Sequence, residues 1–219
     1  MPLTTKWLSN RASETLRFLS DHGFRYYRSF EHFRRSDSEG LSYITINPVT
    51  HNRVFYHLAF YLAVRNDPIE STIKQIVGAP TKLNHYDRSV WNYTVNIGPT
   101  SPHWNYPIPG TWSFQTERDF DSSEREIVRF VTGLALPFLS ENLSKAAIRR
   151  TLLKLPGHAQ NLKPYQQIFA VDILSSDVSS FEADYSLLTA RYKKFHRPFQ
   201  DEFCEFYRRA SQLIHHQVA

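Results

Sequence analysis

The chain has 219 residues, a formal net charge of +5 and 41% hydrophobic residues, which is enough to bury a sizeable core. Its one cysteine, Cys204, excludes an intramolecular disulfide framework and fits a reducing compartment. The N-terminus has no basic and apolar leader, and no uncharged run approaches the ~20 residues that cross a bilayer. We therefore expect a cytoplasmic protein without a membrane segment.

An N-terminal helix is predicted over residues 5–22, because apolar residues recur there at helical spacing. Gly23 can take the positive φ that ends a helix. The next segment, residues 24–35, alternates rings with polar residues and predicts a strand. Phe33 falls out of phase in this strand, which indicates a β-bulge or an exposed ring.

Residues 54–64 carry no charge and predict the central strand of a sheet. Their rings fall on both alternating faces, so we expect cover on both sides of the strand. Turn residues at 37–40 and 48–52 flank a preceding strand over 41–47. The succession predicts an antiparallel meander.

A second helix is predicted directly after the central strand. Asp67 can cap it, Pro68 suits its first turn, Glu70 completes a capping box, and Gly78 ends it. The remaining predicted elements are strands over 89–98, with one wet face, and 111–120, and helices over 121–137, 143–155, 165–174, 181–195 and 199–213.

The elements together predict an α+β fold with an antiparallel sheet of about five strands, an N-terminal helix and several C-terminal helices. Residues 155–164 are the best linker candidate. We therefore expect a sheet domain over 1–155 and a helical C-terminal extension over 156–219 packed on it.

The order of these signals resembles the bacterial family called domain of unknown function 4304, over about residues 10–155. The residues that carry the resemblance are Gly23-Phe24, Phe33-Arg34, Trp112 and Leu136-Pro137-Phe138-Leu139. The resemblance implies a small intracellular bacterial α+β domain. Because that family has no assigned activity, it implies no site residue.

No group of residues predicts catalysis, a metal site or a cofactor. Asp119 and Asp121 stand close together in the sequence, but carboxylates there also suit the start of a helix. His57 lies in the central strand and predicts a buried, neutral ring. Acidic neighbours would keep the Cys204 thiol protonated, and we expect it to pack between helices. The sequence favours a protein that is not an enzyme.

A proline-rich loop over residues 98–110 suits recognition. Four prolines restrict its backbone, while His103, Trp104 and Tyr106 supply large rings. Such a loop could present a preorganised binding surface. The alternative is that the rings fold back and plug the edge of the sheet.

A basic segment near the end of the helix predicted over 181–195 is the second recognition candidate. Arg191, Lys193 and Lys194 alternate there with rings, a combination that can hold single-stranded nucleic acid. The alternative is the solvated face of an ordinary amphipathic helix.

These observations predict an intracellular interaction module that binds another protein, such as an immunity-type inhibitor or an accessory factor. Two alternatives stay open. One is an enzyme of unfamiliar type with a polar cleft formed by Arg25, Glu31, His57, Asn92, Thr94 and Asn96. The other is a nucleic-acid-binding protein that uses Arg25, Arg28, Arg34 and Arg35 with the basic segment of the helix.

Overall fold

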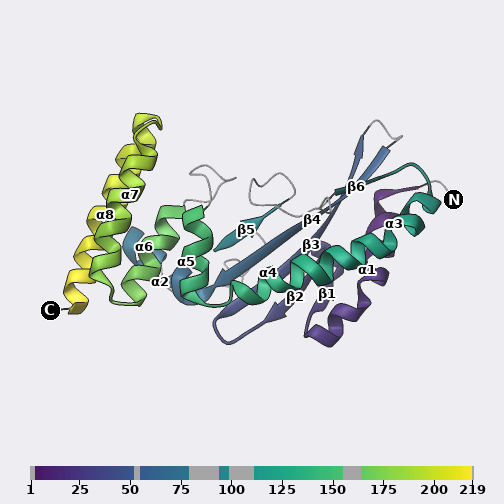
Figure 1. Ribbon diagram of the computed structural model, residues 1–219, viewed down its shortest axis with the longest axis horizontal. Coiled ribbons are helices and arrows are strands. Elements are labelled where there is room, and N and C mark those ends of the chain that lie inside the picture. The colour runs from purple at the N-terminus through teal and green to yellow at the C-terminus, as the bar shows by residue number, and fades with distance from the viewer. Residues whose placement is uncertain (1–2, 52–54, 79–93, 99–110, 155–163, 219) are drawn as a thin grey trace. The chain divides into compact units, whose positions relative to one another are not determined.

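The structure is a computed structural model that describes residues 3–51, 55–78, 94–98, 111–154 and 164–218 (Figure 1). The fold is α+β, as predicted, with an antiparallel sheet, an N-terminal helix and several C-terminal helices. None of the helices in these ranges is both long and apolar enough to cross a membrane.

The chain divides into two compact units. Unit 1 comprises Met1–Val64 and Asn96–Asn142, and unit 2 comprises Arg65–Val95 and Leu143–Ala219. The boundary expected between residues 155 and 156 lies outside the described residues. Unit 2 takes in residues from both sides of that boundary.

The sheet has β4 at its centre, as the uncharged run predicted. Strands β1 to β5 follow one another in order, and β6 also pairs with β4. The described strands are β1 Arg25–Tyr27, β2 His32–Ser36, β3 Gly40–His51, β4 Phe55–Asn66, β5 Val95–Ile97 and β6 Thr111–Phe114.

One face of the sheet forms the core of unit 1 with α1 (Thr5–Thr15) and α3 (Glu117–Phe130). Phe60 of β4 is fully buried there, with its ring 5.7 Å from Trp112 and 5.6 Å from Phe130. The opposite face of β4 is less covered, because Phe55 is 44% exposed and Tyr61 is half-buried. The expected cover is therefore confirmed for the first face and only partial for the second.

The N-terminal helix is shorter than predicted and continues as a 3₁₀ helix, η1 Arg17–His22. In a 3₁₀ helix, side chains three residues apart lie on the same side. Leu16 and Leu19 have this spacing and are both fully buried, so the tighter turn keeps both in the core. Gly23 ends the segment with φ +79°, as predicted.

Gly23→Ala is expected to lower the free energy of unfolding by about 1–2 kcal/mol, because an L residue with a side chain resists this left-handed backbone. A Cβ atom at Gly23 would meet Arg35 Cδ at 3.5 Å, an ordinary contact, so the cost comes from the backbone. Chemical denaturation measures it. Gly78→Ala is the matched control, with φ +75° and open space around a Cβ, and we expect a similar loss. A large loss of stability for Gly23→Ala without a similar loss for Gly78→Ala would show that the cost does not come from the left-handed backbone.

The single strand predicted over 24–35 is wrong, because the structure has two strands there. A 3₁₀ turn, η2 Arg28–Phe30, separates β1 from β2, and Glu31 follows with φ 50°. The strands then pair in antiparallel register, with Tyr26 opposite Phe33. Phe33 is buried, and the exposed ring of this segment is Phe30.

The capping of α2 (Asp67–Val77) differs from the prediction by one residue. The side chain of Asn66, and not Asp67, accepts a hydrogen bond from the Ile69 amide. Glu70 does not complete a capping box; it accepts a hydrogen bond from the Thr94 hydroxyl. Gly78 ends the helix as predicted.

Helix α3 begins earlier than predicted, so the strand expected over 111–120 ends at Phe114. Thr116 and Asp119 form a reciprocal capping box. The amides of Gln115 and Thr116 donate to the Asp119 carboxylate and lower its pKa. The Asp119 carboxylate therefore caps the start of α3, which was the alternative to metal binding considered from the sequence.

Pro137 does not end the helix predicted over residues 121–137, contrary to the prediction. A π-helical turn, η3 Val131–Ala135, follows α3 and leads into α4 Leu136–Glu141. Proline lacks an amide donor and its ring crowds the preceding turn of an α-helix. The wider π turn accommodates it without a break.

Unit 2 is helical, and its described C-terminal helices are α5 Lys145–Lys154, α6 Pro164–Leu174, α7 Val178–Tyr192 and α8 Arg197–Val218. Their positions agree with the predicted helices to within a few residues, except that α8 starts before Pro198 and runs longer. Rings of α6, α7 and α8 pack together, with Tyr165 5.3 Å from Phe203. Cys204 is exposed, so its predicted packing between helices is wrong; its neighbour Phe203 takes the buried position.

Candidate functional site

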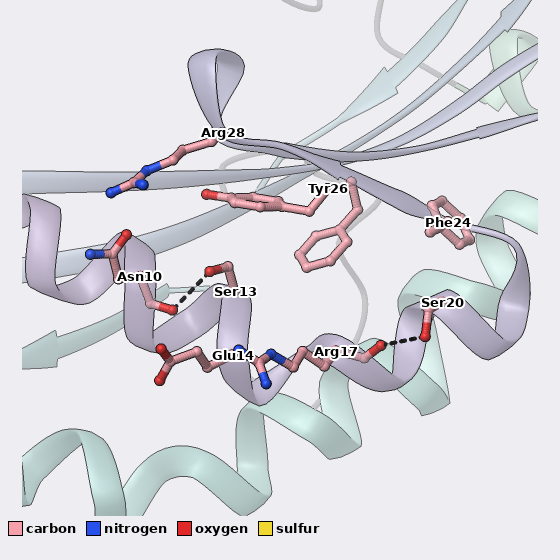
Figure 2. A pocket seen from close by; sticks show the side chains of 9 residues that line it. Asn10, Ser13, Glu14, Arg17, Ser20, Phe24, Tyr26 and Arg28 are labelled. Atoms are coloured by element: carbon pink, nitrogen blue, oxygen red, sulfur yellow. Dashed lines mark hydrogen bonds between the residues drawn. The ribbon is translucent and has the colours of Figure 1, made fainter.

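An open groove of about 560 Å³ lies in unit 1 between the N-terminal helical segment and strand β1 (Figure 2). The helical side contributes Asn10, Ser13, Glu14, Arg17 and Ser20, and the strand side contributes Phe24, Tyr26, Arg28 and Phe33. We call this set the α1–β1 groove. All of its lining residues belong to one unit, so the groove depends on the packing within that unit alone.

The turn at Gly23 positions the two walls of the groove. The Phe24 amide donates to the Leu19 carbonyl at 3.0 Å, which sends the strand back beside the helix that precedes it. Figure 2 shows Ser20 near the Phe24 end and Asn10 near the Arg28 end. The helix and the strand therefore run in opposite directions along the groove.

Aromatic rings line the strand side of the groove. Tyr26 and Phe33 are opposed across β1 and β2, and their ring centroids are 4.9 Å apart. Phe24 and Phe33 are buried, whereas Tyr26 is half-buried. The Tyr26 hydroxyl is 3.4 Å from the Ser9 hydroxyl. These rings form the aromatic floor of the groove, an apolar contact surface whose polar end is the Tyr26 hydroxyl.

Two arginines flank this floor, one on each wall. Arg17 and Arg28 are both exposed, and neither guanidinium forms an ion pair or a hydrogen bond with any described residue. The one carboxylate of the groove, Glu14, is instead 4.0 Å from Arg11. Both guanidinium groups are therefore available to an acidic ligand.

The chemistry of the lining residues suits binding. They supply guanidinium donors, hydroxyl groups, an amide and an apolar floor, with a single carboxylate and neither histidine nor cysteine. In the described ranges, no three His, Cys, Asp or Glu residues gather closely enough to hold a metal ion. The groove can hold a ligand, but it has no pair of groups arranged for proton transfer or nucleophilic attack.

A second cluster of rings lies on the other face of the sheet, around His32. This imidazole is 2% exposed, and the Phe30 ring stacks on it with centroids 5.6 Å apart. Burial, with a smaller contribution from the Arg34 charge, lowers the pKa of His32 to about 4. His32 is therefore neutral at pH 7 and packs as a ring.

The four arginines proposed for nucleic-acid binding do not form one surface. The Arg34 guanidinium lies 4.0 Å from the Tyr27 ring centre, and that of Arg35 lies 4.9 Å from Phe24. Neighbouring residues of a strand point to opposite faces, so Arg34 and Arg35 are separated by the sheet. Arg28 belongs to the groove and Arg25 is exposed on β1.

The predicted loop residues His103, Trp104 and Tyr106 lie outside the described residues. The basic segment is divided. Arg191 donates to the Leu153 carbonyl at 2.7 Å and so joins α7 to the end of α5. Lys193 and Lys194 are exposed beyond α7.

The polar cleft proposed for an enzyme loses one of its members. Thr94 is fully buried; its hydroxyl donates to Glu70 and accepts from the Asn66 amide, both at 2.8 Å. The wet face predicted for this strand is therefore wrong at Thr94. His57 is half-buried, with Nδ1 2.8 Å from the Ser113 hydroxyl, so its predicted burial is only partial. Asn92 and the side chain of Asn96 lie outside the described residues.

Sequence reasoning did not identify the α1–β1 groove. Phe24 and Tyr26 were interpreted as alternating positions of a strand, and no role was predicted for Arg17. The spacing of these residues carries no signal that a helix and a strand face each other. The turn residue Gly23 was the one available indication that the two segments lie side by side.

Comparisons of the chain with known proteins found no matching family model, no similar curated protein and no similar solved structure. The resemblance to domain of unknown function 4304 therefore stays a prediction.

Proposed function

We propose that the chain is a protein-interaction module whose α1–β1 groove binds an acidic segment of a partner protein. The observation that carries this proposal is the pair of unengaged arginines, Arg17 and Arg28, on opposite sides of an aromatic floor. An immunity-type inhibitor or an accessory factor would be a specific form of this function.

Residue chemistry supports a protein ligand. Arginine and large rings are enriched among the residues that dominate protein–protein binding energy. A carboxylate beside Arg17 or Arg28 would form charge-assisted hydrogen bonds, and an apolar side chain next to it would cover Tyr26. We therefore expect the partner segment to carry Asp or Glu next to a large apolar residue.

Selection from a displayed peptide library tests this function. The purified chain is expected to enrich peptides with an acidic residue adjacent to an aromatic or large aliphatic residue. The double variant Arg17→Glu, Arg28→Glu is expected to bind the selected peptides about 100-fold more weakly, because attraction becomes repulsion at two points. Fluorescence anisotropy with labelled peptide measures the affinities.

The control variant is Arg118→Glu, Arg125→Glu, which makes the same change of net charge on exposed positions of α3 in the same unit. It should retain the wild-type affinity. An equal loss in both double variants would show a general charge effect and contradict the site. A selection without acidic enrichment would contradict the proposed function.

A further inference from the structure

We infer that the partner segment binds the groove as an extended strand that pairs with the outer edge of β1 and lengthens the sheet. This inference rests on the proposed function and specifies the backbone conformation of the ligand. It is carried by the position of β1 in the sheet and by the shape of the space next to it.

Strand β1 is the first strand in the order of the sheet, and in the described part of the chain only β2 pairs with it. The backbone amides and carbonyls on its outer side therefore form a template for one more strand. Three residues of β1 span about 10 Å, enough to pair with a short extended segment.

The α1–β1 groove lies along this edge. Its walls are a helix and an edge strand that run in opposite directions, and its length follows the strand from Phe24 to Arg28 (Figure 2). A strand added to an edge lies about 4.8 Å from its neighbour, with alternate side chains on each face. Every second side chain of the ligand would thus enter the groove, where Arg17, Tyr26 and Arg28 line it.

The charge of the edge favours a different protein over a second copy of this chain. Arg25 of β1 and Arg28, which directly follows β1 in η2, are both exposed. Antiparallel pairing of two β1 strands would bring these like charges close together, which is unfavourable. An acidic partner segment would neutralise them.

N-methylation of a selected peptide, one amide at a time, tests the inference. Methylation removes a backbone donor and blocks close approach, so only amides that point toward β1 should be sensitive. Within a stretch of three to five peptide residues, we expect methylation of every second amide to lower the affinity at least tenfold. Methylation of the amides in between should change the affinity little. Hydrogen exchange should also slow at residues 25–27 when the peptide is bound.

The failures of the two proposals are distinguishable. Strand addition would be overturned if sensitivity to N-methylation did not alternate every two residues, or if hydrogen exchange at residues 25–27 did not slow on binding. The proposed function would still stand in that case if Arg17→Glu, Arg28→Glu lost binding. Equal binding by wild type and that variant would overturn the proposed function itself. A stable dimer of the free chain, measured by light scattering, that persists with the peptide bound and itself protects residues 25–27 from exchange would assign the edge to a second copy and overturn the inference.

Discussion

Arg149→Met is expected to lower the free energy of unfolding of unit 2 by about 3 kcal/mol at pH 7. The Arg149 guanidinium of α5 bridges two carboxylates: Nε lies 3.0 Å from Asp172 Oδ1 of α6, and Nη2 pairs with Asp184 of α7. Both acidic side chains are almost fully buried, 2% and 5% exposed. Removing the cation leaves two buried acids with no opposite charge between them.

The same cluster gives a pH dependence with a defined sign. Burial, together with the charge of Asp184, raises the pKa of Asp172 to about 7, and Arg149 opposes the rise. Between about pH 4 and pH 7 the folded chain keeps a proton that the unfolded chain releases. The free energy of unfolding therefore falls as pH rises through this window, by at most about 1.4 kcal/mol per pH unit.

Asp172→Asn should remove this slope. Arg149→Met should extend it above pH 7, because the opposing charge is gone and the pKa of Asp172 rises further. Denaturant titrations at pH 5, 7 and 8.5, combined with hydrogen exchange over α5 to α7, measure both effects. The exposed neighbour Arg150, changed to Met, is the control, with an expected effect within about 0.5 kcal/mol. Equal losses at Arg149 and Arg150 would refute the bridging role.

Phe60→Ala is expected to lower the free energy of unfolding of unit 1 by about 3–5 kcal/mol. This ring is fully buried and contacts Trp112 and Phe130, so its loss removes apolar contacts on several sides at once. The surrounding rings are themselves in contact, Trp112 and Phe130 at 5.5 Å, so the cavity should collapse only partly. Hydrogen exchange of β3, β4 and α3 measures the loss.

Phe55→Ala is the matched control in the same strand. Phe55 is 44% exposed and lies on the opposite face, so we expect a change within about 0.5 kcal/mol. Comparable effects at both positions would contradict the assignment of the core to the Phe60 face.

The elements predicted correctly are those set by neighbouring residues. The uncharged run of β4 and the stops at Gly23 and Gly78 are local signals, and the structure confirms them. The turn between β1 and β2 was missed because Glu31 takes a positive φ without being glycine. The exposed face of β4 was missed because a ring on a strand does not say whether another layer covers it.

The candidate sites depend on contacts between distant residues, which periodicity does not reveal. Arg149 meets Asp172 across 23 positions of the chain. Arg17 and Arg28 belong to different elements and share a groove only because the chain reverses between them. Binding was predicted from the sequence at the proline-rich loop and at the end of α7. Arg28 was the one groove residue for which a binding role was considered, toward nucleic acid.

The π turn has a consequence for how the long third helix meets the sheet. Ile127, Val131, Ala135 and Leu139 are fully buried and stand four positions apart. In a regular α-helix four residues advance by about 400°, so three such steps would rotate the last side chain about 120° from the first. The wider turn unwinds the backbone and keeps Leu139 aligned with Ile127. Deleting one residue between 131 and 135 would leave eleven steps of about 100° between Ile127 and Leu139, so ordinary α-helical winding would keep the two side chains within about 20° of each other.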